Sequence, residues 1–421
     1  LTILPAEAAV KNLPRHTAQA RGEAERAMQE ITEQVEREHA QMVSQEERIS
    51  SVLLHWQPYP AAVRYAVQLT ESMPDGTMRV RETMDRVYTT GLHLPLAGYG
   101  TVDHLYWSVR PLDYDGAPLT AWSVPRPVRG EKADPTAPVL TTEYADMAYA
   151  PLYPVYSWIP LAGQTVHEVE VYRREGTYDR YIHTLRAGEY DVYDDEPFTV
   201  PGTYVYHVRA VTAAGKPLSN WSNYGTFTVA DRTPIAALGD SITHGGGALS
   251  YSPFNLEYNY TTYLDFPAVN LGRSGDTAHT SRLRFEDDVL PYHPRHLLIL
   301  TGSNDLRSDL SAAAIIKELD TIGEKCRQND IRPIFLTLMP LDPENIERAF
   351  HTETDENWRE KLRAINAFIR RQDYFIDLEP YFYDETGTRL DASFAIDGLH
   401  PDIRGKMLMA EIINAHREKF R

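Results

Sequence analysis

Residues 234–243, Pro-Ile-Ala-Ala-Leu-Gly-Asp-Ser-Ile-Thr, place a short apolar run directly before a glycine, an aspartate and a serine. Such a run, bounded by glycine, is typical of a buried strand in a parallel sheet. Further candidate strands follow at 268–271, 296–301, 333–338 and 374–378, with helical stretches near 311–328, 355–371 and 403–419. This alternation of strands and helices predicts an α/β domain with a parallel sheet over residues 231–421.

Polar or glycine-rich segments follow the predicted strands. Ser241 follows the first strand, Gly275 the second and Asn304 the third, while Asp397 and His400 share a C-terminal loop. The carboxyl ends of parallel strands lie at one edge of the sheet, and ligands bind there. We therefore expect these five residues to converge on one site.

The residue types at this edge suit nucleophilic catalysis. A serine hydroxyl such as that of Ser241 is a weak nucleophile unless a base removes its proton. His400 is the natural base, because a histidine pKa lies near working pH. Asp397, three residues earlier, can bind the other ring nitrogen, hold the tautomer and stabilise the imidazolium.

An attacked ester carbonyl becomes an oxyanion, which needs hydrogen-bond donors. The backbone N–H groups of Ser241 and Gly275 and the side-chain amide of Asn304 are the candidates. Glycine at 275 also lets the backbone come close to a ligand.

Four sequence blocks together resemble the SGNH hydrolases, also called the GDSL family, over residues 234–421. They are Gly239-Asp-Ser241-Ile-Thr243, Asn270-x-Gly272-x-x-Gly275, Gly302-x-Asn304-Asp305 and Asp397-x-x-His400. The one departure is Ile242, where the family name has leucine. The resemblance implies a flavodoxin-like sandwich that hydrolyses esters through an acyl-serine. It makes Ser241, Gly275, Asn304 and His400 the four named residues, with Asp397 completing the triad.

Other catalytic classes lack their signatures. The elbow of α/β-hydrolases needs Gly-x-Ser-x-Gly, and position 243 is threonine. The chain has neither a Gly-x-x-x-x-Gly-Lys phosphate loop nor a His-Glu-x-x-His zinc motif. The predicted reaction requires no metal or organic cofactor.

Several of these residues also have an ordinary structural interpretation. Ser241 could cap the helix after its strand, and His400 could be a satisfied structural histidine. His244 could line an acyl pocket or serve the fold. Asp240 and Asp305 are expected to hold loops, and Arg273 and Arg307 to be solvated or ion-paired rather than to bind an anionic substrate.

Residues 51–230 change character to short alternating runs separated by turns. An internal repeat at an offset of 99 aligns residues 107–110 with 206–209, 116–119 with 215–218 and 122–123 with 221–222. A repeat near this length has the size of one β-sandwich. The pattern resembles two fibronectin type III modules, over 51–130 and 131–230.

The aromatic residues of the repeat have two possible roles. Repeat-matched tryptophans predict core packing for Trp56, Trp107, Trp122, Trp158 and Trp221. A sugar-stacking surface needs exposed rings instead. Its candidates are Tyr149, Tyr153, Tyr156, Tyr178 and Tyr181.

Residues 1–50 are predicted to form an N-terminal helical segment. Met28, Val35, Met42 and Ile49 recur every seven residues, whereas the second heptad positions Glu38 and Gln45 are polar. A helix that lies against the body is favoured over a dimerising one. The whole chain is thus expected to be multidomain: an N-terminal helix, two all-β sandwich modules and a C-terminal α/β domain.

Composition limits the partners. The 421 residues carry 60 acidic and 42 basic side chains, a net charge of −18. Nucleic-acid binding needs a basic face, so no nucleic-acid partner is expected, and no apolar run is long enough for a membrane span. The single cysteine, Cys326, excludes an intrachain disulfide and is expected to be a buried small residue. We expect a secreted, periplasmic or cell-surface protein of a bacterium, although no leader is visible, and leave its oligomeric state open.

These observations favour a serine esterase that removes short acyl groups, acetyl above all, from a carbohydrate or another small ester. The carbohydrate rests on the analogy between this architecture and bacterial carbohydrate esterases. The alternatives are a glycan-binding or adhesion protein with a vestigial hydrolase domain, an acyl transferase that uses the same acyl-serine, and a lipase-type esterase.

Overall fold

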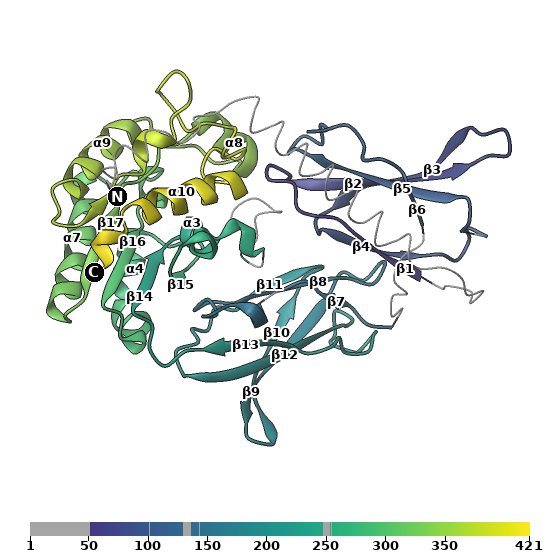
Figure 1. Ribbon diagram of the computed structural model, residues 1–421, viewed down its shortest axis with the longest axis horizontal. Helices are drawn as coiled ribbons and strands as arrows, with labels where there is room; N and C mark the ends of the chain where they lie inside the picture. Colours follow the sequence, from purple (N-terminus) through teal and green to yellow (C-terminus); the bar gives the residue numbers. More distant parts are fainter. Residues whose placement is uncertain (1–50, 101, 129–135, 143, 247–252, 254) are drawn as a thin grey trace, which may run out of the picture.

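A computed structural model describes residues 51–100, 102–128, 136–142, 144–246, 253 and 255–421. The expected N-terminal helix falls outside these residues. Figure 1 shows a sheet surrounded by helices on one side of the molecule and two β-rich modules on the other.

The C-terminal sheet is parallel throughout, and its strand order is β15-β14-β16-β17-β18. This order, 2-1-3-4-5 along the chain, is that of flavodoxin-like folds. All five strands lie where the hydrophobic runs predict them. They are β14 (Ile235–Gly239), β15 (Val269–Gly272), β16 (His296–Leu300), β17 (Arg332–Leu336) and β18 (Phe375–Ile376).

Helices cover this sheet, and the three predicted helical stretches are present as α7, α9 and α10. The α-helices are α3 (Ser241–His244), α4 (Ala278–Leu283), α5 (Phe285–Asp288), α6 (Ser303–Leu306), α7 (Ala312–Gln328), α8 (Pro343–Phe350), α9 (Trp358–Ile369) and α10 (Ile403–Ala415). The 3₁₀ helices are η1 (Tyr144–Asp146), η2 (Leu256–Tyr258), η3 (Tyr260–Tyr263), η4 (Leu290–Tyr292), η5 (Glu379–Tyr381) and η6 (Arg417–Phe420). Cys326 is buried in α7, where burial raises its pKa to about 12.

Both N-terminal modules consist of antiparallel sheets. The first has a four-stranded sheet, β3-β2-β5-β6, and a pair, β1-β4. The second has β10-β9-β12-β13 and β11-β8-β7. The first module's strands are β1 (Ser51–His55), β2 (Arg64–Ser72), β3 (Met78–Val87), β4 (Gly91–Pro95), β5 (Leu105–Leu112) and β6 (Arg126–Pro127). Those of the second are β7 (Val139–Leu140), β8 (Val155–Ile159), β9 (His167–Glu175), β10 (Tyr178–Ala187), β11 (Asp191–Tyr193), β12 (Gly202–Ala210) and β13 (Gly225–Val229). Their identity as fibronectin III domains stays a prediction.

The internal repeat has a physical counterpart in the late strands. The Arg110 guanidinium carbon lies 4.2 Å from the ring centroid of Trp122, and that of Arg209 lies 4.1 Å from Trp221. These two tryptophans are therefore partly exposed under arginines, and the core role expected for them is wrong. Trp56, Trp107 and Trp158 are buried, as expected.

The candidate sugar-stacking tyrosines divide in the same way. Tyr153 and Tyr156 are buried and belong to the core, and Tyr149 is partly buried. Tyr178 and Tyr181 are exposed on β10. Only these two remain available as surface rings among the five.

The second module and the α/β domain share one hydrophobic core, which runs from Tyr144 through Phe227 to the parallel sheet. Leu152 N donates to the Asn270 carbonyl at 2.9 Å, and Tyr292 Oη donates to the Phe198 carbonyl at 2.6 Å. The two units are therefore packed together directly, with no linker between their surfaces.

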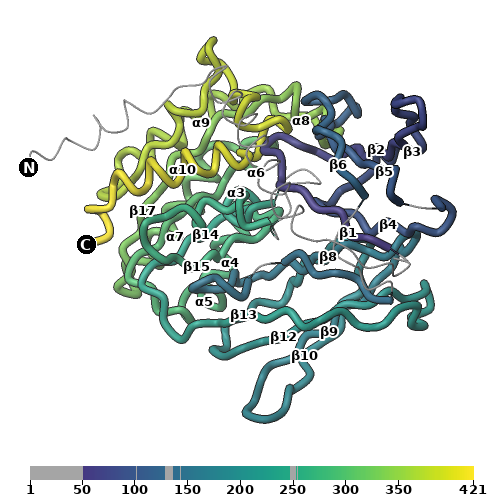
Figure 2. The backbone as a smooth tube through the Cα atoms, turned by 45° about the vertical axis from the view of Figure 1, so that its right-hand side comes forward, coloured from purple at the N-terminus to yellow at the C-terminus, as the bar shows by residue number. Residues whose placement is uncertain are grey.

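The first module has its own core and makes a smaller contact with the α/β domain. Arg348 on α8 forms ion pairs with Asp113 and Asp115 in the turn after β5, at 2.7 and 2.8 Å. Tyr114, in the same turn, packs with Tyr258 in a small cluster. Figure 2 shows α3 on the side of the parallel sheet that faces both modules.

Candidate active site

The five predicted site residues lie in short helices and loops of the α/β domain. Ser241 begins α3, directly after β14, and Asn304 lies in α6, after β16. From β14 the chain continues to β15 on one side and later to β16 on the other. Open α/β sheets bind their ligands at such a switch point, outside the carboxyl ends of the strands.

Ser241, His400 and Asp397 form an unbroken hydrogen-bond chain. Ser241 Oγ lies 2.7 Å from His400 Nε2, and His400 Nδ1 lies 2.7 Å from Asp397 Oδ2. Because a carboxylate only accepts, Nδ1 carries the proton and Nε2 accepts from the serine hydroxyl. All three side chains are buried or nearly so. This tautomer is the one a general base requires.

Asp240, not Ser241, caps the short helix α3. Its Oδ1 accepts from Ile242 N at 2.9 Å, which leaves the serine hydroxyl for His400. Asp240 Oδ2 is buried and has no hydrogen-bond partner among the described residues. Burial raises the pKa of Asp240 to about 6, so this carboxyl is partly protonated in mildly acidic solution.

The Asp397–His400 turn is rigid. Asp397 Oδ1 accepts from the backbone N–H groups of Leu399 and His400, at 2.9 and 2.7 Å. Gly398 has a φ of +76°, and a Cβ there would lie 2.3 Å from the Asp342 carbonyl oxygen. The turn therefore holds the carboxylate and the imidazole in one orientation.

Gly275 and Asn304 follow the two strands beside β14: Gly275 lies in the loop after β15, and Asn304 lies in α6, after β16. Gly275 has a φ of +87°, and a Cβ built there meets no atom within 4 Å. Asn304 Nδ2 donates one hydrogen to the Asp276 carbonyl at 2.8 Å. An amide nitrogen has two hydrogens, so Asn304 keeps a second donor.

A buried arginine that no sequence motif predicted holds the strand ends. Arg284 Nη2 donates to the carbonyls of Gly239 and Leu271, at 3.1 and 2.8 Å, and its other nitrogens bind Asp276 and Asp288. Asp305 accepts from Ala278 N at 2.9 Å, the scaffold role expected for it. The two carbonyls that Arg284 binds belong to separate strands, so no local spacing marks this contact.

A second unpredicted residue is Lys406 on α10, which is fully buried behind the serine. Its Nζ donates to the carbonyl of Ile242, the residue after the serine. Asp240, Asp397 and Asp402 are the carboxylates that act on its charge. Burial nonetheless dominates and lowers the pKa of Lys406 to about 7.

His244 is buried and takes part in the junction with the second module. Its Nε2 lies 2.7 Å from the Tyr153 carbonyl oxygen, and Ser274 N donates to its Nδ1 at 3.1 Å. These contacts require a neutral ring with its proton on Nε2. Burial lowers the pKa of His244 to about 4, consistent with this tautomer.

The two arginines near the sequence blocks are partnered. The Arg273 guanidinium lies over the Tyr153 ring and 3.8 Å from Asp195. Arg307 Nη2 donates to Thr352 Oγ1 at 2.5 Å, and its guanidinium lies over Phe350. Phe350 contacts the His400 ring edge-on at 5.8 Å between centroids. Arg307 thus supports the wall beside the histidine.

Comparisons with known proteins agree with this geometry. The sequence model of the GDSL-like Lipase/Acylhydrolase family matches residues 237–408, a range that contains all five predicted site residues. An acetylxylan esterase of Geobacillus stearothermophilus is 24% identical over 172 residues, which are 39% of this chain and 78% of that protein.

Two further similarities are more limited. The uncharacterized lipoprotein YqeF of Bacillus subtilis is 29% identical over 119 residues, 25% of this chain, and the match spans about half (49%) of that protein. The crystal structure of a GDSL-like lipase from Bacteroides thetaiotaomicron covers 45% of this chain and 92% of its own, with 20% identity and a TM-score of 0.36. The C-terminal part of this chain is thus a GDSL-like acylhydrolase domain.

Proposed function

We propose that this protein is a serine esterase that hydrolyses short acyl esters, above all acetyl esters, of a carbohydrate. The observation that carries the proposal is the continuous chain from Ser241 Oγ through His400 to Asp397, with both links at 2.7 Å. This chain lies at the switch point of the sheet, the place where open α/β sheets bind their ligands.

The geometry suits acylation. His400 Nε2 takes the proton of Ser241 as Oγ attacks the ester carbonyl, and Asp397 stabilises the imidazolium. The oxyanion is bound by the backbone N–H groups of Ser241 and Gly275 and by the second amide hydrogen of Asn304. His400 then gives its proton to the leaving sugar hydroxyl, and an acyl-serine remains.

Deacylation repeats the same steps with water. His400 removes a proton from a water molecule, which attacks the acyl carbonyl, and the proton returns to Ser241 Oγ as the carboxylic acid leaves. Every step uses groups of the chain and of the substrate, so the mechanism calls for no cofactor.

The acetyl-carbohydrate substrate has a separate support. The acetylxylan esterase to which this chain is similar acts, by its name, on an acetylated polysaccharide. The match covers 78% of that protein. A neutral polymer also suits a chain of net charge −18, which repels polyanions.

Replacing Ser241 with alanine tests the reaction. We expect turnover of aryl acetates to fall by several orders of magnitude, because no other group supplies the nucleophile. Ser219→Ala, in the second module, is the matched control and should leave turnover unchanged. Equal turnover in Ser241→Ala and wild type would refute the mechanism.

Two assays test the substrate class. With aryl esters of increasing chain length, acetyl should be the best substrate, and faster turnover of octanoyl esters would refute the short-acyl assignment. With acetylated polysaccharides, free acetate should be released. Acyl transfer to an added sugar acceptor instead of acetate release would make the protein a transferase.

We further place the protein outside the cytoplasm, supported by its similarity to a lipoprotein. Within the described residues no helix has the length and apolar character of a membrane span. Fractionation of the source cells tests this placement, and recovery of the protein only with cytosolic markers would contradict it.

A further inference from the structure

A cavity of about 420 Å³ lies between the two β modules, separate from the esterase site. Its lining comes from β3, β4 and the segments after them in the first module, and from residues 159–163 and 189–190 in the second. None of the described residues of the acylhydrolase domain lines it. This volume lies within the range of small-ligand sites, roughly 300–1,000 Å³.

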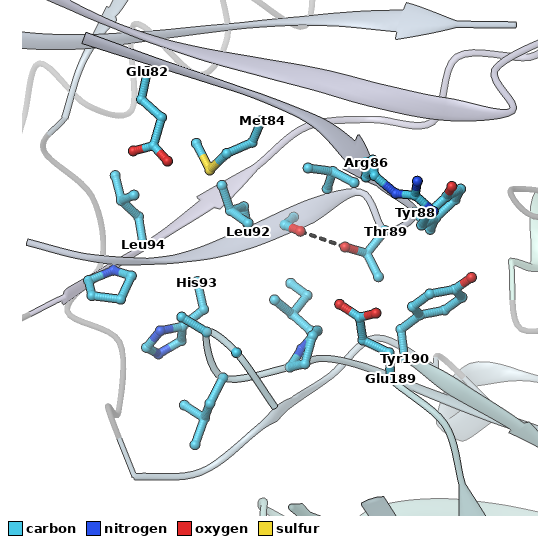
Figure 3. A pocket seen from close by; sticks show the side chains of 18 of the residues that line it. Glu82, Met84, Arg86, Tyr88, Thr89, Leu92, His93, Leu94, Glu189 and Tyr190 are labelled. Atoms are coloured by element: carbon cyan, nitrogen blue, oxygen red, sulfur yellow. Dashed lines mark hydrogen bonds between the residues drawn. The ribbon is translucent and has the colours of Figure 1, made fainter. Parts of the chain in front are cut away.

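One end of the cavity is aromatic. Tyr88 of the first module and Tyr190 of the second stack with ring centroids 5.6 Å apart and planes inclined by 25°. Both rings are only half-buried, and Figure 3 shows Tyr88 and Tyr190 at the same end of the cavity. Tyrosine offers an apolar face with a polar edge, the combination that stacks on a sugar ring while hydrogen-bonding its hydroxyls.

Charged groups line both ends of the cavity. Glu189 lies beside Tyr190 in sequence, and Arg86 lies near Tyr88 in Figure 3. Glu82, near the opposite end, accepts a hydrogen bond from Tyr99 Oη. Charged groups of this kind form strong hydrogen bonds with vicinal hydroxyls: an arginine donates to them, and a carboxylate accepts from them.

The backbone of Glu189 and Tyr190 is anchored by groups other than their own side chains. Trp158 Nε1 donates to the Glu189 carbonyl at 2.8 Å, and Trp158 N donates to the Tyr190 carbonyl at 3.0 Å. A Cβ on Gly91 would lie 2.4 Å from Ile159 Cδ1, so the modules approach closely at the floor of the cavity. The cavity is therefore held open by a fixed contact between the modules.

We propose that this intermodular cavity is a binding site for a neutral oligosaccharide segment, with Tyr88 and Tyr190 as its stacking platform. The choice of a glycan rests on the proposed function. The charges disfavour an anionic ligand, because two carboxylates and one guanidinium line the cavity of a strongly acidic chain. The β modules thus hold the polymer on which the esterase acts.

Affinity electrophoresis of the full chain in gels that contain a deacetylated polysaccharide tests the site. Soluble xylan, galactomannan and anionic polygalacturonate are the probes. Wild type should be retarded by at least one of the two neutral polymers. Tyr190→Ala should weaken this binding about tenfold or more, as loss of a central aromatic contact does.

Two variants separate a binding role from a structural one. Tyr190→Phe keeps the ring and should retain most of the binding. Tyr178→Ala removes an exposed tyrosine from β10, outside the cavity lining, and should bind as wild type does. Circular dichroism and unfolding curves check that each variant is folded.

The outcomes are distinct. Retardation by neither neutral polymer, retardation by polygalacturonate alone, or equal binding by Tyr190→Ala and Tyr178→Ala would each overturn the proposal. Turnover of aryl acetates is measured on the same samples and should be unchanged in all three variants. Polymer binding without turnover would refute the proposed esterase activity but support the binding site. Turnover without polymer binding would support the esterase activity but refute the binding site.

Discussion

Ser241 is surrounded by buried charges that are only partly compensated. One carboxyl oxygen of Asp240 has no hydrogen-bond partner among the described residues. The Lys406 ammonium donates to a backbone carbonyl, which stabilises its charge less than a carboxylate would. Burial therefore moves both pKa values toward neutrality, to about 6 and about 7. The region behind Ser241 titrates within the range in which the enzyme is expected to work.

The role of Asp397 is testable by removing its charge alone. Asp397→Asn keeps the shape but offers an amide that can donate to His400 Nδ1 and stabilise the wrong tautomer. We expect kcat for aryl acetates to fall by about 10⁴, the loss that follows this change in a serine protease. Asp309→Asn, at an exposed carboxylate of the same domain, is the control, and a loss of less than about tenfold in Asp397→Asn would contradict a triad.

Lys406 predicts a pH dependence of stability. Its folded pKa of about 7 lies below the unfolded value near 10.4, so the unfolded chain binds more protons between these limits. Wild type should therefore gain stability relative to Lys406→Met as the pH rises through this window, by up to about 4 kcal/mol.

Urea unfolding at several pH values measures this difference, with Lys216→Met as an exposed control that should show none. A wild-type curve that stays parallel to that of Lys406→Met from pH 7 to 10 would show that Lys406 is charged in the folded protein throughout.

At the scale of single residues, the sequence predicted those site residues that lie in short local motifs. Four short blocks identified Ser241, Gly275, Asn304 and the Asp397–His400 pair, and the structure brings the serine, histidine and aspartate into hydrogen-bond contact. Their catalytic roles stay a prediction. Arg284 and Lys406 were missed, because a buried partner 13 or 164 residues away leaves no local pattern.

At the scale of elements, the strands of the parallel sheet were predictable because each is a buried apolar run that ends in glycine or polar residues. The repeat of the modules was visible too, but it predicted the wrong environment for two tryptophans. Trp122 and Trp221 occupy equivalent positions in the repeat, and each lies under an arginine guanidinium on a partly exposed surface. A sequence repeat identifies equivalent positions, but it does not show which face of a sheet is buried.

The turn between Asp397 and His400 allows a sharp test of one element. In Gly398→Ala, the positive φ and the Asp342 carbonyl 2.3 Å away both oppose a Cβ, so the turn must shift and move His400. We expect kcat to fall at least tenfold, together with a loss of stability of several kcal/mol, roughly the sum of a strained φ and a backbone clash.

Gly387 provides a matched control, because it has a similar φ of +68° and a Cβ added there would meet no atom within 4 Å. Gly387→Ala should lower stability by only about 1–2 kcal/mol and leave kcat unchanged. Equal effects of the two substitutions on kcat would mean that the close approach to Asp342 does not position His400.

At the scale of the whole molecule, the sequence suggested modules in a row, whereas the structure joins the second module to the acylhydrolase domain through a common core. Such a junction could not be predicted, because its hydrogen bonds connect groups that are far apart in the chain. His244 is the clearest case. It lies three residues after Ser241 and binds the carbonyl of Tyr153 in the second module.

This junction should be sensitive to acid. Protonation would place a hydrogen on His244 Nδ1, which now accepts from Ser274 N, and two donors would face each other. The folded pKa of about 4 lies below the unfolded value near 6.5, so the unfolded state binds more protons between these limits. The stability that the neutral ring contributes is complete above pH 6.5 and is lost as the pH falls toward 4, by up to about 3 kcal/mol.

Urea unfolding of wild type and His244→Gln between pH 4 and 7.5 measures this effect, because glutamine does not titrate. Wild type should lose stability relative to His244→Gln as the pH falls from 6.5, whereas His279→Gln, at an exposed histidine, should follow wild type. If wild type and His244→Gln lose stability in parallel, the histidine is not held neutral. The second module would then be attached to the α/β domain by the shared apolar core and the remaining hydrogen bonds.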